Sequence, residues 1–226
     1  MNTAIICGGS IDYEFAEAFI EKHEIDCIIA ADKGLRFCYE KKIFPNYILG
    51  DYDSICPEIL EWYRRQSDVP VTAYPAEKDD TDTAIALAKA LEIGSEKIYL
   101  LGALGGRMDH AVANIQILKN VLDHTSDNTS KRVERSAEAY IVDPQNMICL
   151  IEKEMILKRK EQFGKYVSLL PFTDTVEGIT LEGFKYPLYE YTMKKGESTG
   201  VSNEIVDEEA KVSFLSGVLL MIQSKD

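Results

Sequence analysis

The sequence predicts an α/β fold in which a Rossmann-like domain with a parallel sheet, residues 1–146, is followed by a smaller all-β sandwich domain, residues 147–226. In the first half, short β-rich runs alternate with segments of helical periodicity, which is the pattern of a doubly wound sheet. In the second half, strand-like runs follow one another without a long helical pattern. The polar segment 124–136, which has no periodicity, is expected to form a long loop near the boundary.

The elements of the first half are expected in strict alternation. The expected strands are 3–9, 25–32, 47–51, 71–75 and 97–106, and the expected helices are 11–23, 34–43, 57–66, 78–94 and 109–124. In the last helix, the apolar residues Val112, Ile115, Leu118 and Leu122 keep helical spacing. This order predicts strand–helix–strand units in one sheet.

The elements of the second half are expected to be strands. The strand-like runs are 139–144, 147–152, 166–172, 178–184, 186–193 and 212–224, and turn residues separate them. No internal repeat or low-complexity tract is present in the sequence.

Composition and charge restrict the class of protein. With 226 residues and 46% hydrophobic content, the chain can fill a core. A formal charge of −13 disfavours binding to nucleic acid, because it repels the phosphate backbone. Five scattered cysteines without a C-x-x-C pair favour reduced thiols. The N-terminal residues do not resemble a signal peptide, and no apolar run is long enough for a membrane span, so a soluble cytoplasmic protein without a membrane partner is expected.

The stretch GDYDS places two carboxylates just after the expected strand 47–51. Asp51 and Asp53 are two residues apart, so in extended backbone both side chains point to the same side. The carboxyl edge of a parallel sheet is where such folds bind ligands. Mg²⁺ is commonly held by one or two carboxylates together with phosphate oxygens. Taken alone, an ordinary acidic turn explains this stretch as well.

The stretch KDDTD places three more carboxylates at the start of the expected helix 78–94. One residue is enough to cap a helix, and additional acids add only a little through the helix dipole. At helical spacing Asp79 and Asp82 share a face, whereas Asp80 is rotated away. We therefore expect Asp79 and Asp82 to belong to the site, and Asp80 or Thr81 to cap the helix.

The stretch GALGGRMDHAVAN combines glycines, an arginine and a helix start. Gly102, Gly105 and Gly106 allow close backbone approach to an anion, and the guanidinium of Arg107 suits phosphate oxygens. A glycine-rich turn with a surface arginine is the alternative. Clustered carboxylates repel one another unless a cation neutralises them, so the three stretches together indicate magnesium-dependent phosphoryl chemistry.

Five short motifs in the same order resemble those of the thiamine pyrophosphokinase family. They are ADKG (31–34), GDYDS (50–54), KDDTD (78–82), GGRMDH (105–110) and GVSNEI (200–205). The resemblance implies an α/β catalytic domain, a β-sandwich that helps to bind thiamine, and a homodimer with active sites between subunits. It also implies an enzyme, a thiamine diphosphokinase, that transfers the pyrophosphoryl group of MgATP to the hydroxyl of thiamine, giving thiamine diphosphate and AMP.

The resemblance also implies roles for residues at the matching positions. The catalytic residues would be Asp51, Asp79, Asp82, Arg107 and Asp109. The metal ligands would be Asp51, Asp53, Asp79 and Asp82. Nucleotide contacts would come from Asp32, Lys33, Gly34, Asp53, Ser54, Lys78, Thr81 and His110. The thiamine contacts would be Ser202 and Asn203.

The sequence departs from the family pattern at two points. Lys33 stands where a second glycine is frequent. Some members carry a tryptophan near the Ser-Asn motif that stacks on the thiamine pyrimidine, but the only tryptophan here is Trp62, in the first domain. A nearby tyrosine or phenylalanine is the expected replacement, and the sequence does not single one out.

Three other functions compete with this interpretation. A pyrophosphokinase for another acceptor, such as a hydroxymethylpterin, would keep the same catalytic residues, but the Ser-Asn motif and the β domain argue against it. A magnesium-dependent phosphatase using D-x-D needs a nucleophilic aspartate, which the sequence does not identify. A non-catalytic nucleotide- or thiamine-binding protein would not need so complete a set of acids.

Overall fold

The chain forms an α/β unit followed by an antiparallel β unit, so the predicted fold class is confirmed. The structure, a computed structural model, describes residues 1–51, 55–66, 71–73, 80–126 and 137–226. The chain divides into two compact units, Met1–Pro144 and Gln145–Asp226.

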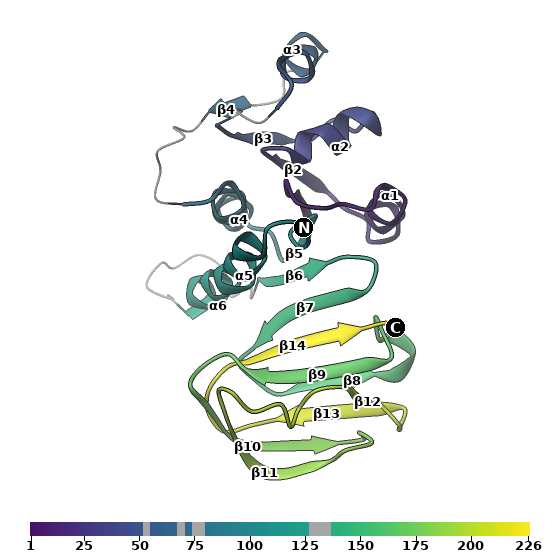
Figure 1. Ribbon diagram of the computed structural model, residues 1–226, viewed down its shortest axis with the longest axis vertical. Helices are drawn as coiled ribbons and strands as arrows, with labels where there is room; N and C mark the ends of the chain where they lie inside the picture. The colour runs from purple at the N-terminus through teal and green to yellow at the C-terminus, as the bar shows by residue number, and fades with distance from the viewer. Residues whose placement is uncertain (52–54, 67–70, 74–79, 127–136) are drawn as a thin grey trace. The chain divides into compact units, whose positions relative to one another are not determined.

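The first unit contains a parallel sheet with the strand order β6-β5-β1-β2-β3-β4 (Figure 1). Its strands are β1 (Asn2–Ile6), β2 (Cys27–Ala31), β3 (Tyr47–Gly50), β4 (Val71–Ala73), β5 (Lys97–Leu101) and β6 (Glu138–Val142). From Thr3 to Ile6 every residue of β1 is buried, as expected of a parallel strand covered on both faces. The chain order reverses between β1 and β5, and at such a point the carboxyl ends of the strands leave a crevice.

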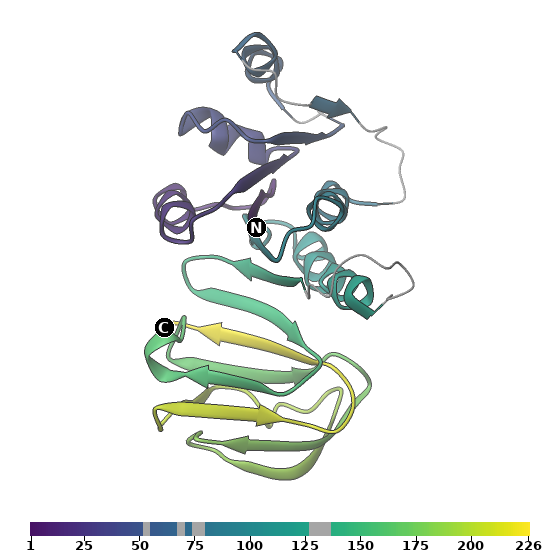
Figure 2. The same ribbon diagram turned by 180° about the vertical axis from the view of Figure 1, so that it is seen from behind.

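Helices cover both faces of this sheet. They are α1 (Tyr13–Lys22), α2 (Gly34–Glu40), α3 (Pro57–Gln66), α4 (Asp82–Glu92), α5 (Met108–Ile117) and α6 (Lys119–Ser126). Figures 1 and 2 show α1 and α2 on one face, and α4, α5 and α6 on the other. The inward residues of α4, Ala86, Leu87 and Ala90, are completely buried. In the described ranges, none of the helices is long and apolar enough to cross a membrane.

The segment 109–124, expected as one helix, forms two. Helix α5 ends at Ile117 and α6 begins at Lys119. Between them, backbone hydrogen bonds join residues three positions apart, as in a 3₁₀ turn. The Leu118 N–H donates to the Ile115 carbonyl at 3.4 Å, and the Val121 N–H donates to the Leu118 carbonyl at 3.2 Å. Leu118 and Val121 are both buried, and this apolar burial compensates for the poorer hydrogen-bond geometry of the tight turn.

The second unit consists of two antiparallel sheets. Their strand orders are β12-β9-β14-β7 and β11-β10-β13-β8. The strands are β7 (Asn146–Ile151), β8 (Met155–Lys158), β9 (Tyr166–Pro171), β10 (Thr175–Glu182), β11 (Leu188–Lys194), β12 (Asn203–Glu204), β13 (Glu209–Ser213) and β14 (Leu219–Ser224), with a short 3₁₀ helix at Arg159–Glu161. On β14, Leu219 and Met221 are buried while Leu220 and Ile222 are partly exposed, which is the alternation expected of a sheet with one covered face.

The segment 212–224, expected as one strand, is interrupted. Strand β13 ends at Ser213 and β14 begins at Leu219. The connecting loop contains Gly217 at φ +98°, a conformation that side chains with a Cβ rarely adopt. The loop that contains this glycine therefore separates the two strands.

Candidate functional site

A cavity of about 780 Å³ lies at the carboxyl ends of β1, β2, β3 and β5 in the first unit. Its walls are the loop after β1, the turn between β2 and α2, Asp51, the start of α4, and the loop between β5 and α5. Its size falls within the range of about 300–1,000 Å³ that is usual for ligand pockets. The cavity stands at the reversal of strand order, where a doubly wound sheet places its ligand.

The described acids of the predicted site meet in this cavity. Asp32 follows β2, Asp51 follows β3, and Asp80 and Asp82 flank the beginning of α4, and these four residues contribute to its lining. The other predicted residues of the two acidic motifs, Asp53, Ser54, Lys78 and Asp79, lie outside the described residues. Carboxylates that share one cavity repel each other, so the arrangement favours a bound cation.

Magnesium suits the donors that are present. Within the described part of the chain, no three His, Cys, Asp or Glu side chains form a group able to hold a metal ion. Mg²⁺ does not need such a cage, because it is usually bound by one or two carboxylates together with water and phosphate oxygens. Asp51 and Asp82 offer oxygen donors of this kind on the wall of one cavity.

At the start of α4, one residue caps the helix and its neighbours line the cavity. The helix begins at Asp82, and Thr81 is its N-cap, since the Thr81 hydroxyl accepts a hydrogen bond from the Ala84 N–H at 3.2 Å. The expectation that Asp80 or Thr81 caps the helix is confirmed, with Thr81 as the cap. Because Asp80 precedes the helix, the argument from a helical face shared by Asp79 and Asp82 does not apply. Asp80 itself lies on the cavity wall.

Arg107 and Asp109 form an ion pair at the start of α5. The Arg107 Nε donates to Asp109 Oδ1 at 3.1 Å, and Nη2 donates to Oδ2 at 2.5 Å. This bidentate bond, made by two well-exposed side chains, lowers the pKa of Asp109 to about 2. Arg107 lines the cavity as predicted, and so does His110, whose N–H also bonds to Asp109 Oδ1 at 3.0 Å. Asp109 therefore orients both the guanidinium and the beginning of the helix.

The predicted nucleotide motif ADKG ends at the same cavity. Asp32 has φ +46°, an uncommon left-handed conformation that often marks functional positions, and its N–H donates to the Leu49 carbonyl at 2.9 Å. Lys33 is exposed and lines the cavity. Gly34 is buried, and a Cβ at this position would lie 1.9 Å from the Ile6 carbonyl oxygen. The glycine therefore allows α2 to rest directly on β1.

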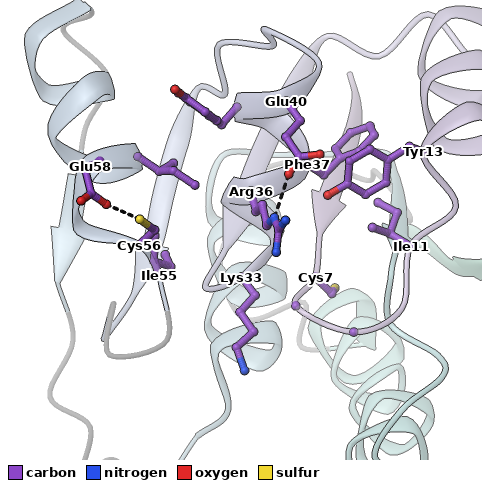
Figure 3. A pocket seen from close by; sticks show the side chains of 14 residues that line it. Cys7, Ile11, Tyr13, Lys33, Arg36, Phe37, Glu40, Ile55, Cys56 and Glu58 are labelled. Atoms are coloured by element: carbon purple, nitrogen blue, oxygen red, sulfur yellow. Dashed lines mark hydrogen bonds and ion pairs between the residues drawn. The ribbon is translucent and has the colours of Figure 1, made fainter.

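A second cavity of about 700 Å³ adjoins the first, and the two share Cys7, Gly8, Gly9 and Lys33. One part of its wall is apolar and aromatic, with Tyr13 and Phe37 in an edge-to-face pair at 5.1 Å between ring centroids (Figure 3). The figure also shows Lys33 extending away from Phe37.

The wall of the second cavity also carries polar groups, and Glu40 lies beside the aromatic pair (Figure 3). Arg36 Nε donates to Glu40 Oε1 at 2.8 Å, and the Cys56 thiol donates to the Glu58 carboxylate (Figure 3). Together with the aromatic wall, these groups give the cavity an apolar face and a few convergent polar groups, the usual lining of a small-molecule site.

Further residues complete the wall of the first cavity. Gly8, Gly9 and Ser10 line it from the loop after β1, where their GGS sequence is compatible with either a nucleotide contact or a simple strand-to-helix turn. Asn114 also lines it, and its Nδ2 donates to the Ala103 carbonyl at 2.7 Å. Its place one helical turn after His110 is the signal that was missed.

Cys7 lies at the boundary of the two cavities and is almost completely buried. Burial raises the pKa of the Cys7 thiol to about 12, although a hydrogen bond with Thr83 opposes the shift. The thiol is therefore protonated at neutral pH and is not a nucleophile.

The two residues of the Ser-Asn motif, both in the second unit, differ in exposure and in hydrogen bonding. Ser202 is exposed, with φ +58°, and its N–H donates to Ser168 Oγ at 3.0 Å. Asn203 is only 4% exposed. Its Oδ1 accepts hydrogen bonds from the Tyr186 N–H at 3.0 Å and the Glu204 N–H at 2.9 Å, and its Nδ2 donates to the Tyr186 carbonyl at 2.8 Å. The Asn203 amide is thus engaged with backbone of its own unit.

The fold and the cavity define a class of protein whose α/β unit is suited to a polyphosphate and whose second unit is a β-sandwich. Residues 20–130 match the family described as "Thiamin pyrophosphokinase, catalytic domain", and residues 154–219 match "Thiamin pyrophosphokinase, vitamin B1 binding domain". The chain belongs to the thiamine pyrophosphokinase family.

Individual relatives agree with this assignment. The chain is 34% identical over 201 residues to thiamine pyrophosphokinase of Bacillus subtilis, covering 88% of this chain and 87% of the relative. Among solved structures, thiamine pyrophosphokinase from Bacillus subtilis superposes with a TM-score of 0.85 at 29% identity, with full coverage of both chains. Thiamin pyrophosphokinase from Geobacillus thermodenitrificans gives a TM-score of 0.81 at 31% identity, covering 100% of this chain and 98% of the other.

Proposed function

We propose that the chain transfers the pyrophosphoryl group of MgATP to the hydroxyl of thiamine, giving thiamine diphosphate and AMP. The observation that carries this proposal is the cavity at the strand ends of the first unit, where Asp51, Asp82 and Arg107 line one space. Such a set of oxygen donors and one guanidinium suits a metal-bound polyphosphate. Both units also match the corresponding domains of one family.

In the proposed reaction, the thiamine hydroxyl oxygen attacks the β-phosphorus of ATP, and the bond to the AMP oxygen breaks. Catalysis of this kind depends on positioning and on electrostatic stabilisation rather than on covalent chemistry by the protein. Arg107 binds phosphate oxygens and stabilises the negative charge that develops there. Asp109 holds the guanidinium in place through its bidentate bond. An aspartate of the cavity accepts the proton of the hydroxyl group.

The acids of the cavity are the proposed magnesium ligands. Asp51 and Asp82 would hold the ion, and Asp53 and Asp79 complete the set implied by the family motifs. When bound, Mg²⁺ neutralises the charge of the polyphosphate and polarises its oxygens. ATP carries about four negative charges, so a chain with a net charge of −13 needs this neutralisation.

The two adjoining cavities together offer space for a nucleotide beside the acids. We place the triphosphate in the first cavity and the nucleoside in the second, against Tyr13 and Phe37. Lys33 lines both cavities and would meet the phosphates where they join the nucleoside. Asp32 contributes to the wall beside it.

The assembly and the location of the enzyme are part of the same proposal. A homodimer with active sites at the subunit interface is supported by Met108 and Val112, which are one helical turn apart on α5 and 73% and 50% exposed. Cytoplasmic location is supported by the thiols of Cys7, Cys27, Cys38 and Cys56, none of which forms a disulfide within the described residues.

The test is to incubate the protein with MgATP and thiamine and to identify both products. We expect AMP and thiamine diphosphate in equal amounts, and neither product when thiamine is omitted. Formation of ADP would indicate an ordinary kinase, and release of phosphate alone a hydrolase. Turnover with a hydroxymethylpterin in place of thiamine would favour the other acceptor, and binding without turnover a binding module.

A further inference from the structure

The two cavities of the first unit meet along a wall that carries a single charged side chain. They share Cys7, Gly8, Gly9 and Lys33. The glycines have no side chain, and burial raises the pKa of the Cys7 thiol to about 12, so this thiol is neutral at neutral pH. Among the described residues, Lys33 therefore supplies the only charge on the shared wall.

The Lys33 ammonium differs from the other cations that line the two cavities. Arg36 Nε donates to Glu40 Oε1 at 2.8 Å. Arg107 Nε donates to Asp109 Oδ1 at 3.1 Å. Lys33 is exposed, and it forms no ion pair with any residue that the structure describes. Its charge is therefore available to an anionic group of a ligand.

Close backbone packing fixes the point from which the Lys33 side chain starts. A Cβ at Gly8 would lie only 3.2 Å from Lys33 Cβ, so the loop after β1 packs directly against the lysine. The next residue, Gly34, rests on β1, since a Cβ there would lie 1.9 Å from the Ile6 carbonyl oxygen. From this anchored position the side chain extends away from Phe37 (Figure 3). Lys33 is thus held at the shared wall with its ammonium away from the aromatic pair.

The proposed nucleotide has to cross this wall with one particular phosphate. With the triphosphate in the first cavity and the nucleoside in the second, the α-phosphate lies at the boundary, because it joins the two parts. An ammonium group is a compact charge with three N–H donors, and it forms charge-assisted hydrogen bonds with phosphate oxygens. Lys33 is therefore placed to bind the α-phosphate.

The α-phosphate is also the group on which charge accumulates during the proposed transfer. The thiamine hydroxyl oxygen forms a bond to the β-phosphorus, and its proton passes to an aspartate of the cavity. The bond from the β-phosphorus to the oxygen that bridges to the α-phosphorus breaks, and its electron pair stays on that oxygen. The phosphate of AMP thus gains negative charge relative to the α-phosphate of ATP. A cation at this place binds the transition state more tightly than the substrate, and so raises kcat.

We infer that Lys33 is a catalytic residue that binds the α-phosphate and stabilises the charge on the departing AMP. The inference rests on the proposed function, because it concerns the leaving group of that reaction. It divides the cations between the two sides of the bond that breaks: Arg107 lines only the first cavity and binds the transferred phosphates, whereas Lys33 binds the phosphate that stays with the nucleoside. Since Lys33 stands where a second glycine is frequent in the family, this contribution belongs to this chain rather than to the family pattern.

The first test compares steady-state constants of substituted proteins. Lys33→Met keeps an unbranched side chain and removes the charge, so it should lower kcat by about 10–100-fold, the effect of losing one hydrogen bond to a charged group. The KM for thiamine should change by less than about twofold, because the lysine does not contact the acceptor. Lys33→Arg, which keeps the charge, should give a kcat between those of Lys33→Met and the wild type.

The matched control is Lys22→Ala. Lys22 is exposed in the last turn of α1 and does not line either cavity, and its loss changes the net charge of the chain by the same amount. The kcat of this variant should equal that of the wild type. Urea denaturation compares the stability of the variants, and Lys33→Gln serves as the neutral test variant if Lys33→Met fails to fold.

The second test measures binding of the product by titration calorimetry. Lys33→Met should raise the Kd for AMP by about tenfold or more, because AMP carries the phosphate that the ammonium binds. The Kd for adenosine, which has no phosphate, should change by less than about twofold. A purely structural role of Lys33 would weaken the binding of both compounds alike, so the ratio of the two Kd values separates the two explanations.

The third test measures the charge beside the phosphate of bound AMP. The second pKa of a phosphate monoester is about 6, and a neighbouring ammonium lowers it by favouring the dianion. In a ³¹P NMR titration, the midpoint for AMP bound to the wild type should therefore lie at least about 0.5 pH unit below that for AMP bound to Lys33→Met. Lys22→Ala should give the wild-type midpoint.

The outcomes distinguish the inference from the proposed function. If the wild type forms no thiamine diphosphate from MgATP and thiamine, the proposed function is wrong. If it does, but Lys33→Met keeps the wild-type kcat, or AMP and adenosine lose affinity equally, the inference is overturned while the function stands. A kcat of Lys33→Arg as low as that of Lys33→Met, or equal ³¹P midpoints in Lys33→Met and the wild type, would likewise contradict it.

Discussion

The two units of the chain use their polar side chains in opposite ways. In the first unit, the parallel strands satisfy their own backbone, and Asp51, Asp80 and Asp82 line a cavity beyond the strand ends. In the second unit, an irregular connection leaves backbone groups without a strand, and the Asn203 amide bonds to them. The polar motif residues of the first unit therefore line a cavity, whereas Asn203 supplies hydrogen-bond partners to the backbone of its own unit.

The largest expected effect tests the direct role of the acids in the first unit. Asp51→Asn should lower the rate of AMP formation by about 10²–10³-fold, because it removes a charge that would balance the proposed magnesium ion. The KM for thiamine should change little. The control is Asp12→Asn, which keeps the cap of α1, where Asp12 Oδ1 accepts from the Phe15 N–H at 2.9 Å. A wild-type rate for Asp51→Asn would mean that the carboxylates of the cavity do not contribute to catalysis.

In both units, a glycine lies directly against a backbone carbonyl oxygen of another element, and we expect this close packing to matter equally in the two units. In Gly34→Ala the new Cβ would lie 1.9 Å from the Ile6 carbonyl oxygen, and in Gly200→Ala 2.1 Å from the Leu169 carbonyl oxygen. Each substitution should lower the free energy of unfolding by about 2–3 kcal/mol, measured by urea denaturation, because backbone must move to admit the methyl group.

Open glycines provide the control for these two substitutions. Gly94 and Gly196 have positive φ values, but a Cβ at either position meets no atom within 4 Å. Gly94→Ala and Gly196→Ala should therefore cost only about 1 kcal/mol, the strain of the left-handed backbone. Equal losses at all four glycines would show that backbone conformation, and not the close approach, determines the stability.

The smallest expected effect concerns the exposed pair of Arg107 and Asp109. The bidentate bond lowers the pKa of Asp109 from its ordinary value of 3.8 to about 2. Because the folded value is the lower one, the contribution of the pair to stability is present above pH 3.8 and is lost as the pH falls through about 2. An NMR titration of the Asp109 carboxyl carbon should show a midpoint near 2, and Arg107→Ala should move it towards 3.8.

The matched control for this titration is Arg64→Ala, which breaks the exposed pair of Arg64 with Glu61 at 3.0 Å. It should leave the Asp109 midpoint where it is. A midpoint that stays low in Arg107→Ala would mean that the helix start, rather than the guanidinium, stabilises the carboxylate.

The sequence was sufficient where local rules determine the structure. Alternating patterns predicted the parallel sheet, and the residue types at the start of α4 predicted that Thr81 or Asp80 would cap it, as Thr81 does. The sequence located these two acids because each lies at the boundary of a regular element. Asp51 directly follows β3, and Asp82 begins α4. Such residues are positioned by the element to which they belong.

The sequence was insufficient where distant residues determine the structure. The helix is interrupted at Leu118, which is buried in the core, and the helical spacing of the apolar residues gave no sign of this. The bonds between Asn203 and Tyr186 join residues 17 positions apart across an irregular connection, which no local pattern encodes. The second cavity likewise arises only when α1, α2 and the start of α3 come together.

The thiols on the cavity walls have a practical consequence for labelling. Burial raises the pKa of Cys7, which both cavities share, to about 12, so at neutral pH its thiol stays protonated and lacks the thiolate that alkylating reagents attack. Cys56, on the wall of the second cavity, is exposed. A fluorophore attached through a maleimide would therefore mark Cys56 and leave Cys7 unmodified. It would test the proposed entry of nucleotide into the second cavity without altering the acids of the first.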